Sequence, residues 1–333
     1  MLLGPCVASQ LGEQDELNVR SVVAARLIKR TADVSKDNEA GFAEVSWVHS
    51  FDSANVWASH FSLQFDRLLG SGILREAYAS HFANWGIIDF GYLQKAVGQV
   101  QFFDEYNPWS RFYEHPLLWE QWGAGLRYDY ISVVLPWALS TAAAVNGRES
   151  GFATMDVSFH PHWGSWTFSG GAVTYDPEEN DHFWRIGTDG FANTGPVQWH
   201  TVASHTRYLG ANSNTNLTMR PGREDIAMLE LLWRHPLGEF KALGYTREYH
   251  KRFDHREAQI SGEWLLLPNS HLGIGPRLDW MDSDGETSWF PRAVLEGRFL
   301  AEDKLGFRLE AGIRDYSESV VSRELMGSVW MRF

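Results

Sequence analysis

Hydrophobic and polar residues alternate along most of this chain, which is the pattern of a β-strand with two unlike faces. The clearest example is the end of the chain, where the apolar face consists of Leu325, Gly327, Val329, Met331 and Phe333. The alternation recurs from about Leu17 to Phe333 without a helical interval. The pattern therefore predicts an all-β protein with antiparallel strands that each have one apolar and one polar face.

No segment fits a helical membrane domain. The longest uncharged stretch, Tyr130–Gly147, has 18 residues and contains Pro136, whereas a spanning helix needs about 20 predominantly apolar residues. A lone membrane helix there is the alternative interpretation, but the charged, alternating sequence on both sides favours strands.

The aromatic content shows what the apolar faces contact. The 333 residues include 16 Trp, 11 Tyr and 20 Phe, yet the mean hydropathy is −0.31. A soluble core with so many rings would bring long apolar runs, which this chain lacks. Rings near strand ends are typical of the interfacial girdles of a membrane barrel. A soluble β-sandwich or propeller is the alternative, and the repeat of about 40–50 residues that a propeller needs is missing.

Charge and cysteine content exclude other classes. The net charge of −13 argues against a nucleic-acid-binding protein, whose affinity comes largely from Lys and Arg. The single Cys6 excludes an internal disulfide framework and a cysteine zinc site. We expect no cofactor and no metal, since His160 and His162 lie in a proposed turn where exposure alone explains them.

The connections between strands alternate between short and long, as do the turns and external loops of outer-membrane barrels. We count about 18 strands, with 16 or 14 as alternatives. In lipid every backbone polar group needs an internal partner, so the strands must close. The sequence thus predicts a closed antiparallel transmembrane β-barrel over residues 10–333, with a lumen wide enough for water.

The first residues, 1–9, resemble the end of a secretory signal peptide, with Val7 and Ser9 as the small residues before the cleavage site. The mature chain would begin near Gln10. Export agrees with a multi-pass barrel in the bacterial outer membrane, in contact with outer-membrane lipid and lipopolysaccharide.

Three short segments, Leu74–Tyr78, Ile87–Gly91 and Ala96–Gln99, resemble a strand pair of Gram-negative outer-membrane porins, most of all the phosphate-selective type. The resemblance covers residues 74–147 and includes Trp122–Tyr128, where the next strand resumes. It implies that the third external loop, here at about 100–121, folds into the barrel. No run of Arg or Lys matches a phosphate ladder, so anion selectivity is not implied.

The end of the chain also resembles that family. Val329, Met331 and Phe333 look like its assembly signal, which the barrel-assembly machinery would read. A homo-trimer or an envelope protein partner is also compatible with the sequence.

The loop at 100–121 supplies the candidate pore constriction, which consists of Asp104, Glu105, Tyr106, Trp109, Arg111, Glu114 and Glu120. Charged side chains in a narrow pore act as a selectivity ring. Four carboxylates against one arginine would favour cations. An ordinary external loop that packs on its neighbours is the alternative.

Alternation also predicts which charges face the lumen, and the candidates for the lumen wall are Arg127, Arg277, Arg292, Glu296, Arg298 and Arg308. Most of these residues should pair across neighbouring strands. A register slip of one residue would reverse any of these assignments.

The favoured function is a porin for ion transport and passive diffusion of small polar solutes. One alternative is a structural barrel that houses or binds a protein partner. Another is an outer-membrane hydrolase built on His200, Ser204 or His205. Ser204 and His205 would point to opposite faces of a strand, and His200 would lie about 13 Å from Ser204. We assign no catalytic residue and expect the chain not to be an enzyme.

Overall fold

The computed structural model describes residues 9–12, 15–30, 34–35, 40–51, 56–66, 71–103, 116–132, 134–146, 150–176, 181–209, 222–250, 254–269, 271–299, 304–316 and 320–332. Strand is the only regular structure in these ranges besides turns and bends. Within them, no helix has the length and apolar character needed to cross a membrane.

Twenty strands form one sheet, and two of them, β1 (Ser9–Gly12) and β3 (Val34–Ser35), are short pieces paired with β2. The other eighteen are β2 (Asp15–Arg30), β4 (Ala40–Ser50), β5 (Trp57–Asp66), β6 (Ser71–Ala83), β7 (Gly86–Val97), β8 (Trp119–Ile131), β9 (Trp137–Asn146), β10 (Ser150–Phe159), β11 (Gly164–Asp176), β12 (Asp181–Thr194), β13 (Val197–Tyr208), β14 (Gly222–His235), β15 (Gly238–His250), β16 (Asp254–Asn269), β17 (Leu272–Ser283), β18 (Glu286–Phe299), β19 (Leu305–Tyr316) and β20 (Val320–Arg332).

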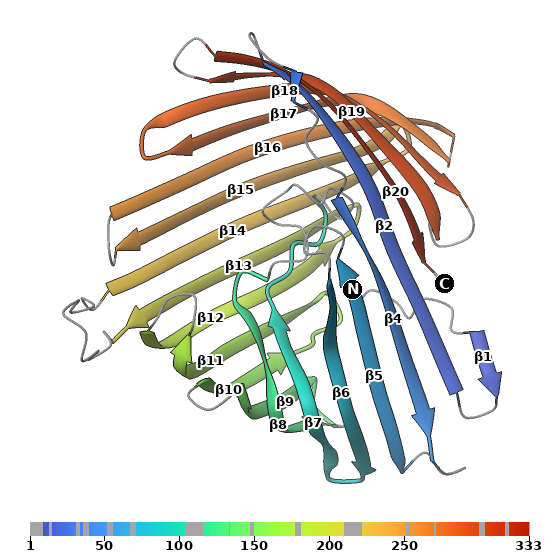
Figure 1. Cartoon of the computed structure of the whole chain (residues 1–333), viewed down its shortest axis with the longest axis vertical. Helices are drawn as coiled ribbons and strands as arrows, with labels where there is room; N and C mark the ends of the chain where they lie inside the picture. Colours follow the sequence, from blue (N-terminus) through green and yellow to red (C-terminus); the bar gives the residue numbers. More distant parts are fainter. Residues whose placement is uncertain are drawn as a thin grey trace.

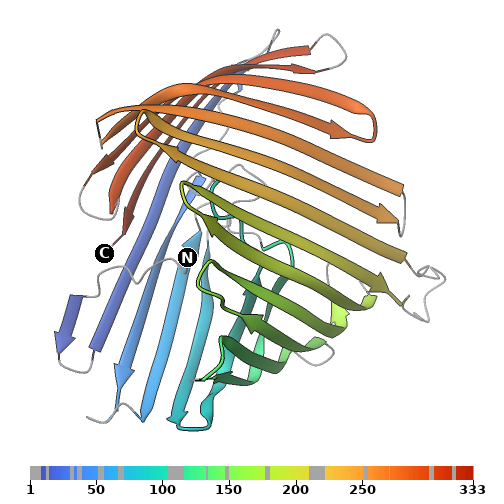
Figure 2. The same ribbon diagram turned by 180° about the vertical axis from the view of Figure 1, so that it is seen from behind.

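The eighteen long strands close on themselves. Each pairs antiparallel with the next, and β2 pairs with β4 on one side and with β20 on the other. Figures 1 and 2 show the resulting ring of tilted strands from two opposite sides. Closure satisfies the backbone hydrogen bonds that an open edge would leave unpaired in lipid. The prediction of a closed antiparallel barrel of 18 strands is confirmed.

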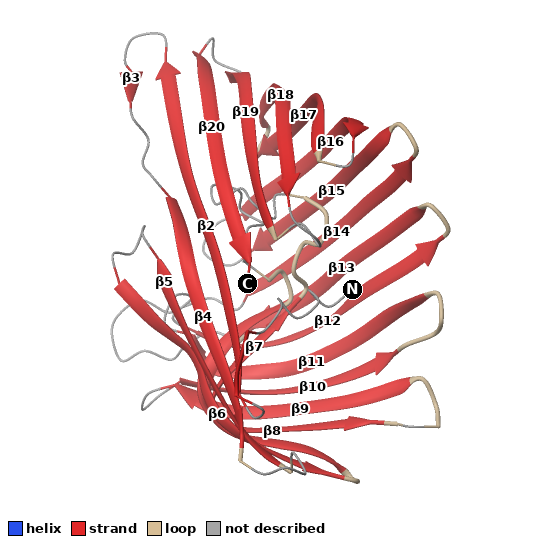
Figure 3. Cartoon of the chain, turned by 90° about the vertical axis from the view of Figure 1, so that its right-hand side faces the viewer, coloured by secondary structure: helices blue, strands red, loops and turns tan. Residues whose placement is uncertain are grey.

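The two ends of the barrel differ in the lengths of their connections, and Figure 3 shows the tight turns at one end from the side. At the turn end, where β2 begins and β20 ends, the connections are tight, as at Asn84–Trp85 and Gly195–Pro196. At the opposite loop end, residues 98–118 and 209–221 form the longest connections. One connection at the loop end is short, since β17 and β18 are joined by the two-residue turn Asp284–Gly285.

The outer face is apolar, with aromatic residues toward both ends. Leu309, Leu325 and Val329 are about half exposed, as expected of side chains in contact with lipid. Trp47, Trp57, Trp85, Trp163 and Trp199 are exposed near the turn end, and Trp184 and Trp289 near the loop end. These residues form the two belts that the aromatic content of the sequence predicted.

The inner face has two contrasting parts. On β15 to β19 lies a charged wall, which we define as Glu239, Lys241, Glu263, Arg277, Asp279, Arg292, Glu296, Arg298, Arg308 and Glu310. On β9 to β15 lies an apolar wall, defined as Ala142, Ala144, Phe152, Val173, Phe183, Val202, Tyr208, Ile226, Met228, Leu243, Tyr245 and Tyr249. The sequence predicted polar residues on the lumen side, so the apolar wall is unexpected. Its side chains need other apolar groups to shield them from water in the lumen.

Candidate pore constriction

The connection between β7 and β8, residues 98–118, turns into the barrel at Gly98. Gly98 has a φ of +84°, which side chains rarely allow, and a Cβ there would lie 2.9 Å from the backbone nitrogen of Leu118. Its N–H donates to Asp189 Oδ2 at 3.0 Å. Leu117 N–H donates back to the Gly98 carbonyl at 2.9 Å, so the two ends of the loop are joined.

The strongest attachment of the loop is to Glu230 on β14, whose side chain is fully buried. Gln101 N–H donates to Glu230 Oε2 at 2.8 Å. Phe102 and Phe103 both donate from their N–H groups to Oε1 at 3.0 Å. Three successive backbone donors on one carboxylate are charge-assisted bonds, which are stronger than neutral ones. They hold residues 101–103 against the inner face of β14.

His200 on β13 holds the two carboxylates in place. Its Nδ1 lies 2.7 Å from Glu230 Oε2, and its Nε2 lies 2.8 Å from Asp189 Oδ1. Because both partners are carboxylates, both ring nitrogens act as donors, which is the hydrogen-bonding pattern of the imidazolium form. We call Asp189, His200 and Glu230 the loop anchor, since they join β12, β13 and β14 to the loop.

The described ends of the loop also cover the apolar wall. Phe103, Leu118 and the adjacent Trp119 are fully buried and belong to the same cluster of side chains as the wall. Trp119 Nε1 donates to Ser169 Oγ at 2.7 Å, and the Leu118 carbonyl accepts a bond from Arg185 Nη1 at 2.7 Å. Burial of each such side chain contributes about 1.5–3 kcal/mol. The ends of the loop therefore pack against the apolar wall.

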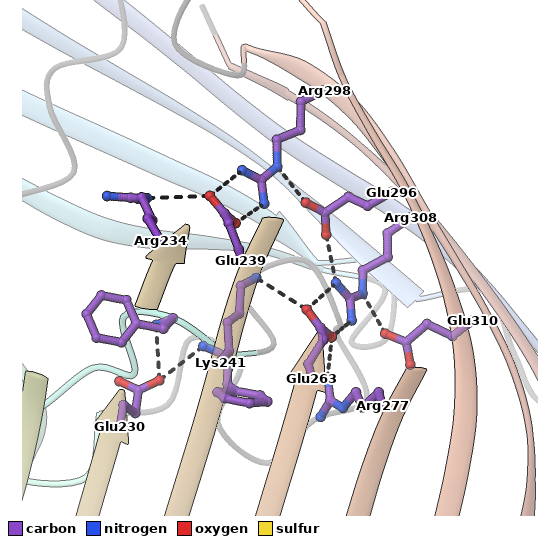
Figure 4. Close-up of polar contacts among 12 residues, drawn as sticks. Glu230, Arg234, Glu239, Lys241, Glu263, Arg277, Glu296, Arg298, Arg308 and Glu310 are labelled. Carbon is purple, nitrogen blue, oxygen red and sulfur yellow. Dashed lines mark hydrogen bonds and ion pairs between the residues drawn. The ribbon is translucent and has the colours of Figure 1, made fainter. Parts of the chain in front are cut away.

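The charged wall is an alternating network of cations and carboxylates, shown in Figure 4. Arg308 Nε lies 2.6 Å from Glu310 and its Nη1 lies 2.7 Å from Glu296, while its Nη2 pairs with Glu263. Arg298 bridges Glu239 and Glu296 at 3.0 and 2.6 Å. Arg298, Arg308 and their partners come from β15, β16, β18 and β19, so the network ties four strands together.

Two cations of this wall, Lys241 and Arg298, are more accessible than the carboxylates they pair with. The side chains of Lys241 and Arg298 are 14% and 20% exposed, whereas those of Glu263 and Glu296 are 1% and 3% exposed. Arg127 on β8, paired with Asp89 and Asp129, is also partly exposed. Lys241, Arg298 and Arg127 therefore present partly exposed positive charge on the inner face, and Asp129, 28% exposed, presents negative charge beside Arg127.

Apart from Glu120, the sequence-derived site residues divide into three groups. Arg127, Arg277, Arg292, Glu296, Arg298 and Arg308 lie on the inner face, where each pairs with carboxylates or cations of its own or neighbouring strands. Val329 and Met331 lie on the outer face of β20. Asp104, Glu105, Tyr106, Trp109, Arg111, Glu114 and Phe333 lie outside the described residues.

Glu120 needs a correction. The loop ends at Leu118 rather than at Gln121, and Glu120 lies within β8 next to Trp119, which points into the barrel. Alternation places Glu120 on the outer face, opposite Ala96 of β7. It therefore does not belong to the candidate constriction.

The loop anchor was not predicted, although His200 was considered as part of a hydrolase. His200 bonds to two carboxylates, and the Ser204 hydroxyl has no hydrogen-bond partner among the described residues. His205 pairs with Asp225 on the outer face. One signal was present in the sequence, since Glu230 shares its strand face with Ile226, Met228 and Leu232. A carboxylate on an otherwise apolar face needs a buried partner.

No protein-family model and no curated protein matches the sequence. Solved structures do match over nearly its whole length. OpdL of Pseudomonas aeruginosa superposes with a TM-score of 0.59 at 10% identity, over 96% of this chain and 98% of that chain. OccK8 (OprE) of the same organism gives 0.58 at 8% identity, over 96% and 98%. The trimer form of OmpT, an outer membrane protein of Vibrio cholerae, gives 0.54 at 10% identity, over 96% and 100%.

These neighbours are Gram-negative outer-membrane β-barrels. The chain therefore has the fold of a bacterial outer-membrane, multi-pass β-barrel, as the alternation and the porin resemblance predicted. At such low identity the match defines the fold, and the subfamily is not identified.

Proposed function

We propose that this chain is an outer-membrane porin that lets small polar solutes diffuse passively through its lumen. The observation that carries the proposal is the anchoring of the third loop-end connection inside a closed barrel, by three backbone N–H groups on the buried Glu230. A loop held there narrows the lumen without a chemical step. A barrel of 16–18 strands is wide enough to keep an aqueous path beside it.

Solutes would pass between the loop and the charged wall. The ends of the loop cover the apolar wall. The accessible lumen surface is therefore the one with Lys241, Arg298 and, on β8, Arg127. Fixed charges in a low-dielectric pore focus the local potential and select ions by sign. Selectivity would then depend on the acidic loop residues acting opposite the cations of the wall.

A liposome-swelling assay tests the proposal. Liposomes containing the purified barrel should swell in isotonic solutions of small uncharged sugars, at rates that fall as the sugar becomes larger. Liposomes without protein set the background. If protein-containing liposomes swell no faster than this background for the smallest sugar, passive diffusion is refuted.

Ion preference gives a sharper test of the loop. The triple variant Asp104→Asn/Glu105→Gln/Glu114→Gln removes three negative charges, so the reversal potential in a KCl gradient should move toward lower cation preference. The matched control is Glu120→Gln, which removes the same kind of charge from the outer face of β8 and should leave the reversal potential unchanged. A triple variant that behaves like the control would refute a role for the loop in selectivity.

A further inference from the structure

The outer face carries a row of basic and aromatic side chains at the loop end of β12 to β15. The register places Arg207 directly opposite Arg223, and Arg223 directly opposite His250. Trp184 on β12 completes the row, opposite Arg207. These side chains point outward, because the neighbouring residues Tyr208, Glu224 and Tyr249 are buried in the lumen.

The two arginines are poorly compensated by this chain. Like charges directly opposite each other destabilise a sheet. Arg207 is exposed and has no ion pair with any described residue. Arg223 is half exposed, and its Nε lies 3.7 Å from Asp225 Oδ2. The other oxygen of Asp225 is already bonded to His205 Nδ1 at 2.6 Å.

The other carboxylates nearby face other basic side chains. Glu248 on β15 lies 4.0 Å from Arg256, and Asp254 on β16 lies 2.8 Å from His250 Nδ1. Among the described strands, no carboxylate is therefore left for Arg207. Arg207 and Arg223 are therefore exposed and incompletely neutralised, which suits them to bind an anion from outside this chain.

The aromatic residues at this height identify where the row lies in the membrane. Trp184 is 37% exposed, and its ring centroid lies 5.5 Å from that of His205. Trp280 and Trp289 mark the same end of β17 and β18. Tryptophan gathers at the level of the lipid headgroups. An anion that reaches Arg207 and Arg223 from the outer side is therefore in the headgroup layer.

We propose that Arg207 and Arg223 together bind the phosphate of a phosphorylated lipid headgroup. Guanidinium groups bind phosphate through two parallel N–H donors, and two of them on adjacent strands can hold one phosphate from both sides. Below the row, the small side chains of Ala203 and Ala227 leave a shallow outer surface for acyl chains. This site is independent of whether the lumen conducts.

Native mass spectrometry of the full barrel in neutral detergent tests the site, with lipid A bearing two phosphates as the probe. The wild-type barrel should retain the lipid, and Arg207→Ala/Arg223→Ala should bind it about 30-fold more weakly, from the usual contribution of two cations near an anionic surface. The control Arg256→Ala removes an exposed cation from β16 that already faces Glu248, and should bind the lipid as the wild type does.

Two further measurements decide what is bound. Lipid A without phosphates should be lost as readily from the wild type as from the double variant, and inorganic phosphate should not compete at equal concentration. Retention of the dephosphorylated lipid by the wild type would show binding through acyl chains alone, and competition by inorganic phosphate would show a free-anion site. Either result, or unchanged binding by the double variant, overturns the proposal. The single variants Arg207→Gln and Arg223→Gln repeat the test if the double variant fails to fold.

Discussion

Replacing Glu230 with glutamine is expected to change the channel from a steady to a noisy conductor. The amide keeps one acceptor oxygen, so the N–H groups of Gln101, Phe102 and Phe103 lose a shared charged acceptor, and His200 loses one of its two carboxylates. Hydrogen bonds to a charged group are each worth about 1.5–3 kcal/mol. We therefore expect single-channel recordings to show open-channel fluctuations and a raised mean conductance.

The matched control for this variant is Glu310→Gln. Glu310 is also a buried inner-face carboxylate and pairs with Arg292 and Arg308, but those partners lie on β18 and β19 rather than in the loop. It should lower stability without adding current noise. Equal noise in both variants would show that the effect comes from a weakened barrel and not from a released loop.

Removal of Arg308 should produce the largest loss of stability in the barrel. Arg308→Met leaves Glu263, Glu296 and Glu310 buried without their shared cation. Breaking a buried ion pair by removing one partner costs about 3–5 kcal/mol. Urea unfolding of the barrel in lipid vesicles should show a loss of about this size, because three carboxylates are affected at once while each keeps a second cation partner.

An exposed arginine provides the comparison. Arg256→Met removes a cation that is 69% exposed and only 4.0 Å from Glu248, so its unfolding free energy should change by less than about 1 kcal/mol. If Arg308→Met were as stable as this control, the charged wall would be solvated rather than a buried network. The interpretation of its carboxylates as shielded would then be wrong.

Alternation alone predicted most of the barrel. The strands at Arg292–Arg298 and Arg308 have their charges inside and Leu295, Phe299 and Leu309 outside, as the sequence indicated. This works because lipid and lumen impose opposite polarity on the two faces. The prediction fails where the inner face does not contact water. Val202, Met228 and Leu243 have the pattern of lipid-facing residues but pack under the ends of the loop.

The loop anchor could not be derived from the sequence. Asp189, His200 and Glu230 are brought together by the register of β12, β13 and β14. The loop residues that they hold lie about a hundred residues earlier in the chain. The boundary of the loop was also misplaced by three residues. The sequence pattern assigns Trp119, Glu120 and Gln121 to the loop, because an inward-facing tryptophan departs from the polar inner face that alternation predicts.

The proposed porin function requires an open lumen beside the anchored loop, and planar-bilayer recording of the purified wild-type barrel tests this requirement most directly. We predict discrete conductance steps with a linear current–voltage relation, each step corresponding to one inserted barrel or oligomer. A folded barrel that inserts but stays silent, and that co-purifies with a protein filling its lumen, would contradict the account and favour a structural role in an envelope complex.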